Sequence, residues 1–271
     1  MKKTFKSILM LFLAMGLSFC FSTCSDDDND NDNTELSQKN ETFNIDGVEF
    51  TMVYVEGGTF TMGATSEQGS EFVDDDEKPT HQVTLSSYYI GETEVTQALW
   101  QAVMGNNPSW FKGYNLPVES ISYEDIQGFI TKLNQKTGKT FRLPTEAEWE
   151  FAARGGNKSK GYKYSGSNNL NDVAWYRDNA NKKTNPVKTK QANELGIYDM
   201  SGNIWEWCSD WYGDYSSSSQ TNPSGANSGS NRVVRGGSWG INARRCRVSD
   251  RDYGNPSYSY YDLGFRLALA R

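Results

Sequence analysis

The side chains best suited to chemistry in this chain are two cysteines and one histidine. Cys208 and Cys246 are the thiols that remain when the N-terminal segment, which carries two further cysteines, is set aside. In an oxidising compartment such a pair usually closes a disulfide; two free cysteines buried as small hydrophobic side chains are the alternative. His81 is the single histidine of the sequence. One imidazole excludes metal sites that need two or three histidines, such as zinc-protease and facial-triad iron centres.

Charge and composition narrow the class of protein. The 271 residues include 27 Lys and Arg against 34 Asp and Glu, a net charge of −7, which argues against a general nucleic-acid binder. Only 36% of residues are hydrophobic, but 8 Trp, 15 Tyr and 13 Phe each bury a large area and allow a packed core. We therefore expect a folded, acidic, aromatic-rich protein with no nucleic-acid partner.

The N-terminus has the pattern of an export signal. Three lysines within the first six residues precede an apolar run from Ile8 to Phe19, which is too short to span a bilayer as a helix and is typical of a secretory signal. Ser22-Thr23-Cys24 resembles a lipobox, and this predicts a signal peptide over 1–23 and a lipid-modified Cys24 that anchors the chain to a membrane. Ordinary cleavage nearby is the alternative.

An acidic segment follows the predicted lipidation site. Residues 24–42 contain seven acidic residues and one lysine, so this segment predicts a solvated tether ahead of a single domain over 43–271. An acidic run directly after a lipidated cysteine also resembles the surface-export signal of some Gram-negative lipoproteins. We therefore expect an outer-membrane lipoprotein exposed at the cell surface, with a plain spacer as the alternative.

Local patterns in the remaining chain predict both helices and strands. Ser122-x-x-Asp125 and Thr145-x-x-Glu148 are capping boxes that start two helices, and a third helix ends at Gly105. Strand-like runs occur at 49–56, 82–90, 232–235 and 263–270, and the Ser- and Gly-rich stretch 216–229 predicts a flexible loop. Together these patterns predict an α+β domain with irregular structure in its second half.

Seven motifs, in order along the chain, resemble the formylglycine-generating enzyme (sulfatase-modifying factor) family. They are GGTFTMG at 57–63, EKPTHQV at 77–83, ETEVT at 92–96, RLPTEAEWE at 142–150, GNIWEW at 202–207, RGGSW at 235–239 and LGFR at 263–266. The resemblance runs from about residue 50 to the C-terminus. It implies a C-type-lectin-like fold: a small twisted antiparallel sheet with flanking helices and long calcium-stabilised loops.

The resemblance also locates the positions of the family's chemistry. Its enzymes oxidise a sulfatase cysteine to formylglycine with copper and oxygen, and hold copper between two cysteines five residues apart. Here those positions are Ile241 and Cys246, while Ser238 and Trp205 match two further active-site positions. Isoleucine offers no metal ligand, so formylglycine synthesis is predicted to be lost. The alternative is a residual oxidase in which Cys246 works with a substrate thiol.

The loop 198–206 matches a calcium loop of the family. The resemblance implies one structural calcium ion bound by the Asp199 and Glu206 side chains and the Gly202 and Ile204 carbonyls. Hard oxygen donors on a glycine-containing turn suit calcium. The alternative is that the two carboxylates only cap backbone N–H groups.

The segment 246–262 has the composition of a binding loop. It mixes Tyr, Ser, Gly, Asn, Asp and Arg with almost no aliphatic side chain, as antibody loops do. We expect a face that binds a protein or glycan ligand; tyrosines that merely cover the core, or a docking surface within an envelope adhesin, are the alternatives. The expected contact residues are Asn242, Arg245, Asp250, Arg251, Asp252, Tyr253, Tyr258, Tyr260 and Tyr261.

Overall fold

The computed structural model describes residues 40–271 apart from 70 and 72. The signal peptide, Cys24 and nearly all of the tether lie outside the described residues, so those predictions remain predictions. The first strand begins at Glu41, slightly before the domain start expected at residue 43. Within the described part of the chain, every helix is too short or too polar to cross a membrane.

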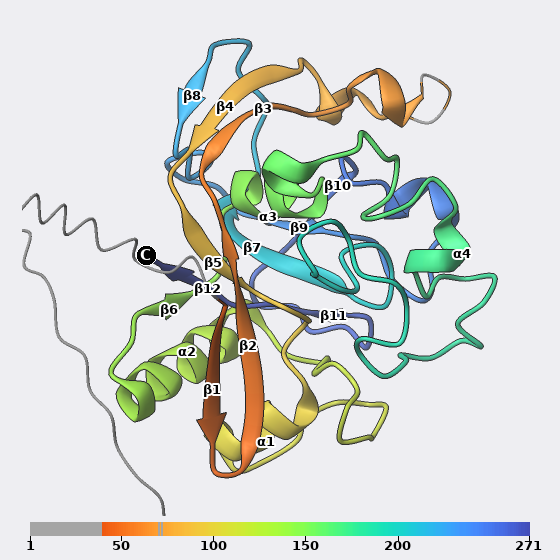
Figure 1. Cartoon of the computed structure of the whole chain (residues 1–271). Coiled ribbons are helices and arrows are strands. Elements are labelled where there is room, and N and C mark those ends of the chain that lie inside the picture. Colours follow the sequence, from red (N-terminus) through yellow and green to blue (C-terminus); the bar gives the residue numbers. More distant parts are fainter. Residues whose placement is uncertain (1–39, 70, 72) are drawn as a thin grey trace, which may run out of the picture. The chain divides into compact units, whose positions relative to one another are not determined.

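The first and last strands of the domain belong to one five-stranded antiparallel sheet (Figure 1). Its strands, in spatial order, are β1 (Glu41–Ile45), β2 (Val48–Val55), β5 (Tyr88–Gly91), β12 (Ala268–Ala270) and β6 (Phe141–Arg142). The C-terminal strand β12 pairs with both β5 and β6. This sheet therefore ties the end of the chain to its first half.

Two smaller sheets complete the β structure. The four-stranded sheet contains β10 (Arg251–Gly254), β9 (Arg232–Arg235), β7 (Trp205–Trp211) and β11 (Leu263–Gly264), with β11 parallel to β7. The three-stranded sheet contains β3 (Gly58–Met62), β4 (His81–Leu85) and β8 (Gln220–Thr221). The resemblance implied one small sheet, whereas the described residues form three.

The helices begin at the capping signals that the sequence predicts. Ser122 Oγ and Thr145 Oγ1 accept hydrogen bonds from the backbone N–H groups of the third helical residues of α2 and α3, so both capping boxes are confirmed. Gly105 and Gly138 adopt the left-handed conformation that ends α1 and α2. The helices are α1 (Gln97–Met104), α2 (Tyr123–Thr137), α3 (Glu146–Ala153) and α4 (Leu170–Val173), with short 3₁₀ turns at Ser66–Gln68, Asp75–Glu77, Gly156–Lys158 and Ala243–Cys246.

Two strand predictions and one loop prediction are wrong in detail. The run 82–90 is divided between β4 and β5 because Ser86 N–H donates to Asn222 Oδ1 and Ser87 Oγ accepts from Gly57 N–H, contacts that lie outside the ladder. The run 263–270 is divided between β11 and β12. β11 ends at Gly264, which packs so closely on the backbone that a Cβ there would lie 2.2 Å from Val118 O. The stretch 216–229 contains β8, which pairs with β4.

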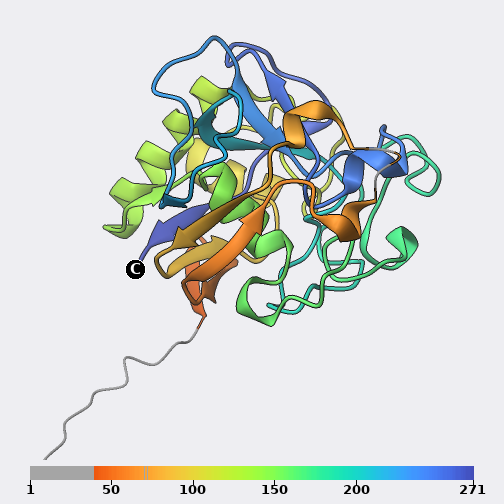
Figure 2. The same ribbon diagram turned by 90° about the horizontal axis from the view of Figure 1, so that it is seen from above.

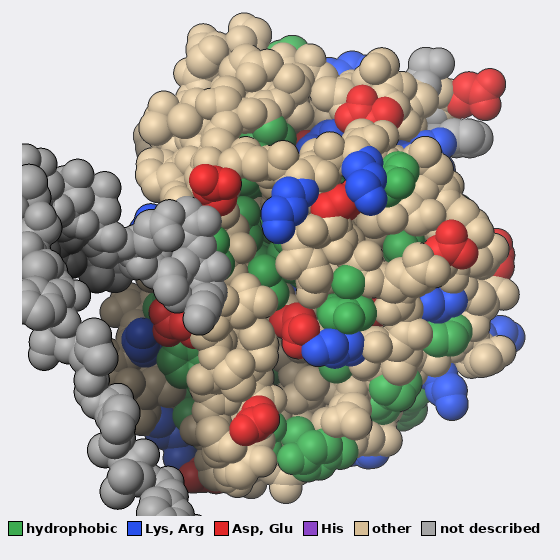
Figure 3. Space-filling model, in the orientation of Figure 1, with side chains coloured by type: hydrophobic (Ala, Val, Ile, Leu, Met, Phe, Trp, Pro, Cys, Tyr) green, Lys and Arg blue, Asp and Glu red, His purple; other side chains and the backbone are tan. Residues whose placement is uncertain are grey.

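The core has two large clusters and one small one. The first packs α1 and α2 against the five-stranded sheet, with the Trp100 and Phe129 rings stacked at 5.1 Å. The second surrounds Trp149 of α3, and the third is a small cluster beneath the loops around α4. Seen from above, α2 (yellow-green) lies on one side and the irregular segment 155–200 (green to teal) on the opposite side (Figure 2). On the visible part of the face in Figure 3, acidic and basic side chains alternate.

Candidate functional site

The first part of the candidate site is the position where the family's enzymes hold copper. Cys246 ends the 3₁₀ turn Ala243–Cys246 and is completely buried, and Ile241 packs against the same small apolar cluster. The thiol points to the Asn242 carbonyl, with Sγ 3.9 Å from the oxygen. Burial, and then the negative charge of Asp250, raises the pKa of the Cys246 thiol. A protonated thiol is a poor nucleophile and a poor metal ligand.

The other matched active-site positions lie beside this cluster but are already engaged. Ser238 is buried, and its Oγ donates a 2.8 Å hydrogen bond to Asp262 Oδ2. Trp205 is buried as well, with the Arg245 guanidinium 5.5 Å from its ring centroid. Asp262 is the last residue of the segment 246–262 and was not among the residues expected to contact a ligand. With one protonated thiol and no second soft donor among the described residues beside it, this donor set does not fit a copper ion.

The predicted disulfide between Cys208 and Cys246 is wrong, because both cysteines are free. Cys208 lies in β7 within the second cluster, whereas Cys246 belongs to the third. Each thiol is therefore surrounded by a different set of apolar side chains. The two cysteines instead fit the alternative, in which both are buried as small hydrophobic residues.

The predicted calcium loop brings its carboxylates into very different surroundings. Asp199 is 3% exposed, its Oδ2 accepts the Lys188 N–H at 2.7 Å, and its Oδ1 has no partner in the described part of the chain. Glu206 is fully buried, and both its oxygens bind Arg266 at 2.6 Å while Oε2 also accepts Trp149 Nε1–H at 2.7 Å. Asp199 therefore has a free oxygen for a cation, and Glu206 does not.

The backbone of this loop requires glycine. Gly202 has a φ of +82°, and a Cβ there would lie 2.3 Å from the Trp175 carbonyl oxygen. Ile204 follows, buried immediately before β7. The Gly202 and Ile204 carbonyls, which the resemblance implies as calcium ligands, thus belong to a tight and buried turn.

Glu94 is a second carboxylate of this region that the sequence analysis did not single out. It is 1% exposed; Oε2 accepts Asn203 Nδ2–H at 3.3 Å, and Oε1 has no partner among residues 40–271 as described. Burial and the charges of Asp199 and Glu206 raise the pKa of Glu94 well above its usual value. Burial also raises the pKa of Asp199 to about 6. Two buried acids with one free oxygen each are a donor set that fits a hard cation.

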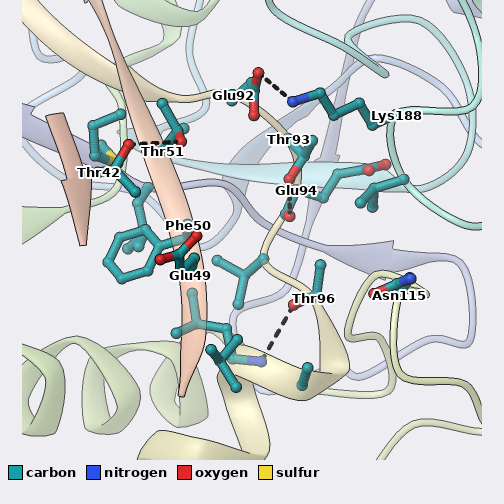
Figure 4. Close-up of a pocket in the computed structure, with 18 of the residues that line it drawn as sticks. Thr42, Glu49, Phe50, Thr51, Glu92, Thr93, Glu94, Thr96, Asn115 and Lys188 are labelled. Atoms are coloured by element: carbon teal, nitrogen blue, oxygen red, sulfur yellow. Dashed lines mark hydrogen bonds and ion pairs between the residues drawn. The ribbon is translucent and has the colours of Figure 1, made fainter. Parts of the chain in front are cut away.

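A cavity of about 420 Å³ reaches this region from the surface. Figure 4 shows it between the β1–β2 hairpin, which contributes Thr42 and Thr51, and the segment that carries Glu92 and Glu94. At its rim Lys188 Nζ pairs with Glu92 at 2.6 Å (Figure 4). Lys188 thereby links the cavity to the loop 198–206, because its backbone N–H binds Asp199.

A third group of acids lies elsewhere and is already compensated. Oxygens of Asp74, Glu77 and Asp250 lie within 4.8 Å of one another. Arg247 pairs with Glu77 at 2.6 Å, and Arg245 pairs with Asp74 at 3.1 Å and with Asp250 at 3.3 Å. A metal ion would have to displace these guanidinium groups. The triad is therefore an ion-pair network that joins residues 74–77 to the C-terminal segment.

The predicted ligand-binding face is corrected at two positions. Asp250 and Arg251 are 0% and 2% exposed, so neither can contact a ligand on the surface. Arg251 makes a buried pair with Glu146, and Arg245 is largely covered and bound to Asp252. These side chains hold the C-terminal segment in place. The error arose because Glu146, which receives Arg251, and Glu77, which binds Arg247 beside Asp250, lie far away in the sequence.

The remaining tyrosines take part in two groups of ring contacts. The Phe111 and Trp239 ring centroids lie 5.6 Å apart, Trp239 and Tyr261 lie 5.6 Å apart, and Tyr258 and Tyr260 lie 5.9 Å apart. We call these five residues the aromatic patch. Tyr258, Tyr260 and Tyr261 are 52%, 47% and 53% exposed. The patch joins three separate segments of the chain.

The segment that carries Phe111 was not identified from the sequence. Trp110, which precedes it, is 75% exposed, and Ser120 N–H donates to the Tyr260 carbonyl at 2.9 Å, tying this segment to the tyrosine loop. Tyr253 is exposed but packs on Tyr212 at 4.6 Å, apart from the ring contacts of the patch. Asn242 is exposed. The two adjacent aromatic residues Trp110 and Phe111 were the sequence signal that could have identified this segment.

Comparisons with known proteins agree on the family and the fold. A family model described as the sulfatase-modifying factor enzyme 1-like domain matches residues 39–271. Chaperone protein LppX of Paenibacillus barcinonensis is 35% identical over 73% of this chain and 81% of its own length, and formylglycine-generating enzyme of Streptomyces coelicolor is 31% identical over 80% and 88%. Treponema denticola variable protein 1 has a similar structure, with a TM-score of 0.78 and 37% identity over 86% of this chain and 99% of that chain. PvdO from Pseudomonas aeruginosa superimposes with a TM-score of 0.70 and 25% identity over 85% and 98%. The fold predicted from the sequence is confirmed.

Proposed function

Because this chain belongs to the sulfatase-modifying factor enzyme 1-like family, we propose that it uses that family's fold as a ligand-binding module without oxidase chemistry. The observation that carries the proposal is the aromatic patch. All the large hydrophobic side chains exposed in the described part of the chain are Trp or Tyr, and none is aliphatic. Such side chains provide rigid contact area with polar edges at a small entropic cost.

The same segments that expose these rings are held firmly from beneath. Glu119 is buried, and its Oε1 accepts the Phe111 N–H at 2.8 Å. Ser238, next to Trp239, is fixed by Asp262, which lies next to Tyr261. Rings that are positioned before binding lose less freedom when a ligand docks. Ser238, which matches an active-site position of the family's enzymes, therefore helps to position the rings of the patch.

The surroundings of Cys246 support the absence of oxidase activity. Copper(I) requires thiolate ligands, and here a buried thiol with a raised pKa faces isoleucine and aromatic side chains. The chain is thereby a divergent family member in which one of two active-site cysteines is replaced. A copper-dependent conversion of a sulfatase cysteine to formylglycine is the alternative that this feature disfavours.

A structural calcium ion is part of the proposal. Asp199 Oδ1 and Glu94 Oε1 would contribute its carboxylate ligands, and the loop at Gly202 and Ile204 would contribute carbonyl oxygens. This ligand set differs from the one that the resemblance implied: Glu94 takes the place of Glu206, because both oxygens of Glu206 are bound to Arg266. The ion would be structural, because it would compensate two acids that are otherwise buried without a counter-ion.

The N-terminal pattern supports export and anchoring. The apolar run followed by Ser22-Thr23-Cys24 and an acidic segment would place the domain on a lipid anchor at the outer membrane, displayed at the surface. A ligand-binding domain in this position would meet protein or glycan partners. The alternative is that the protein is a structural component of an envelope adhesin and uses the same patch as its docking surface.

The relative named as a chaperone suggests a second candidate. LppX is 35% identical, and a chaperone also needs exposed apolar contact area for partner proteins. The aromatic patch would supply that area. Binding to one defined ligand favours a specific binding module, whereas equal binding to many unfolded proteins favours the chaperone.

Arrays of glycans and of extracellular proteins test the proposal. We expect binding by the parent protein, its loss in the variant Tyr258→Ser/Tyr260→Ser/Tyr261→Ser, and its retention in the control Tyr253→Ser, which removes an exposed tyrosine outside the patch. Binding that is equal in the parent and in the triple variant would overturn the role of the patch.

A further inference from the structure

A second cavity, of about 470 Å³, lies on a part of the domain that the proposed function does not use. It is enclosed by the first turn of α3, the end of β7, the loop 213–226 and β10. We call it the β7 pocket. Its charged lining includes Glu146, Asp210 and Arg251. Its volume is that of a site for a small organic molecule.

One of its buried acids is fully compensated by the protein. Arg251 Nε and Nη2 bind Glu146 Oε1 and Oε2 at 2.7 and 2.9 Å, and Tyr215 donates to Oε1 at 3.2 Å. Burial alone would raise the pKa of Glu146, but Arg251 and Arg235 hold it below its usual value. Glu146 therefore needs no counter-ion from a ligand.

The other buried acid has no such partner. Asp210 is 3% exposed, and its Oδ2 accepts the Glu146 N–H and the Ser209 hydroxyl, each at 3.0 Å. Its Oδ1 receives no hydrogen bond from the residues that the structure describes, and no Lys or Arg among them forms an ion pair with it. Asp210 lines the pocket, so the free oxygen belongs to a carboxyl that borders an accessible cavity.

We propose that the β7 pocket binds a primary ammonium group, with Asp210 Oδ1 as its acceptor. An ammonium group supplies both a hydrogen-bond donor and the positive charge that this buried carboxylate lacks. Asp210 differs from the neighbouring acids of α3, because Glu146 is paired with Arg251 and Glu148 with Arg142, whereas Asp210 has no cationic partner in the described part of the chain. Arg251 lines the same pocket, but its positive charge is balanced by the ion pair with Glu146.

The rest of the lining suits the polar remainder of such a ligand. Ser216, Gln220, Thr221 and Ser224 line the same cavity and offer hydroxyl and amide groups. A short polyamine and an amino sugar share the ammonium chemistry and both fit the volume. The two sources are distinguished by experiment.

Calorimetric titration of the protein with matched pairs of ligands tests this site. The pairs are putrescine with 1,4-butanediol and glucosamine with glucose, which differ in the ammonium group. We expect at least one amine to bind about tenfold or more tighter than its hydroxyl analogue, and Asp210→Asn to abolish that advantage. The control Asp214→Asn removes an exposed charge at the rim and should change affinity by less than about threefold. Putrescine binding alone assigns a polyamine, and glucosamine binding alone assigns an amino sugar.

The proposal is overturned if neither amine binds better than its analogue, or if Asp210→Asn binds as the folded parent does. Should Asp210→Asn fail to fold, the parent itself provides the test. Burial and the charge of Glu146 raise the pKa of Asp210 to about 7, so amine affinity should fall as the pH drops below that value. His81→Gln controls for protonation of the histidine that also lines the pocket and should keep the decline. An affinity independent of pH would contradict the assignment.

Discussion

Ile241 and Cys246 pack into the same buried apolar cluster, so the two positions that would hold copper in the family's enzymes together form a piece of hydrophobic core. Tyr164 and Tyr176 complete the surroundings of the thiol. The loss of one ligand is therefore accompanied by an environment that favours the neutral thiol over the thiolate. Isoleucine at this position offers no metal ligand, and the cluster around the thiol consists of apolar and aromatic side chains.

The two cysteines should react only after unfolding. Both are buried and free, and burial raises both thiol pKa values, so iodoacetamide should leave Cys208 and Cys246 unmodified in the native protein. In denaturant without reductant, peptide mass spectrometry should find both alkylated. A cross-linked peptide containing the two cysteines in the unreduced digest would contradict the observed separation.

Chelation of calcium should lower thermal stability. An ion present at a hundredfold excess over its Kd adds about 2.7 kcal/mol, which corresponds to about 5–10 °C in Tm for a domain of this size. The variants Asp199→Asn and Glu94→Gln should lose this response to chelator. Glu206→Gln, which weakens the Arg266 pair, should keep it. A Tm that is unchanged by chelator in the parent would remove the calcium site.

The buried pair of Glu206 and Arg266 should dominate the stability of the four-stranded sheet. Arg266→Met leaves a completely buried carboxylate without its cation, which should cost about 3–5 kcal/mol in the free energy of unfolding. Urea denaturation measures this loss. The double variant Glu206→Gln/Arg266→Met should recover part of it, since no charge is then left unpaired. A loss below about 1 kcal/mol in the single variant would mean that the pair is not isolated from water.

Asp210 should make stability fall as the pH rises. Its folded pKa of about 7 lies above the value of an unfolded aspartate, so the fold favours the protonated form. That contribution is fully present below the unfolded pKa and is lost as the pH rises through about 7. Relative to Asp210→Asn, the parent should lose up to about 4 kcal/mol between about pH 4 and about pH 8. Urea denaturation across this range should show converging curves at low pH; parallel curves would contradict the raised pKa.

Local signals predicted the elements that depend on local contacts. The boxes at Ser122 and Thr145 and the left-handed Gly138 lie within a few residues of the helix ends they define, so the sequence contains the whole cause. Arg142 and Arg154 likewise pair with Glu148 and Glu150, which lie within a few residues of them in the sequence.

What the sequence could not predict depends on partners far along the chain. Arg251 is buried because Glu146, 105 residues away, receives it, and Arg247, which pairs with Asp250, is itself held by Glu77, 170 residues away. The aromatic patch similarly requires Phe111 to meet Trp239, a contact between segments that share no motif. Composition can suggest a binding loop, but burial within it is decided by these distant contacts.

The most direct test of the account is the reaction of the protein with copper, oxygen and a Cys-x-Pro-x-Arg peptide, followed by mass spectrometry of the peptide. A formylglycine-generating enzyme tested in parallel shows that the assay works. The account predicts that the peptide cysteine remains intact, because Cys246 is a buried neutral thiol facing isoleucine. Detection of the formylglycine aldehyde with the parent protein, and its loss in Cys246→Ser, would contradict the binding-module account and restore the oxidase.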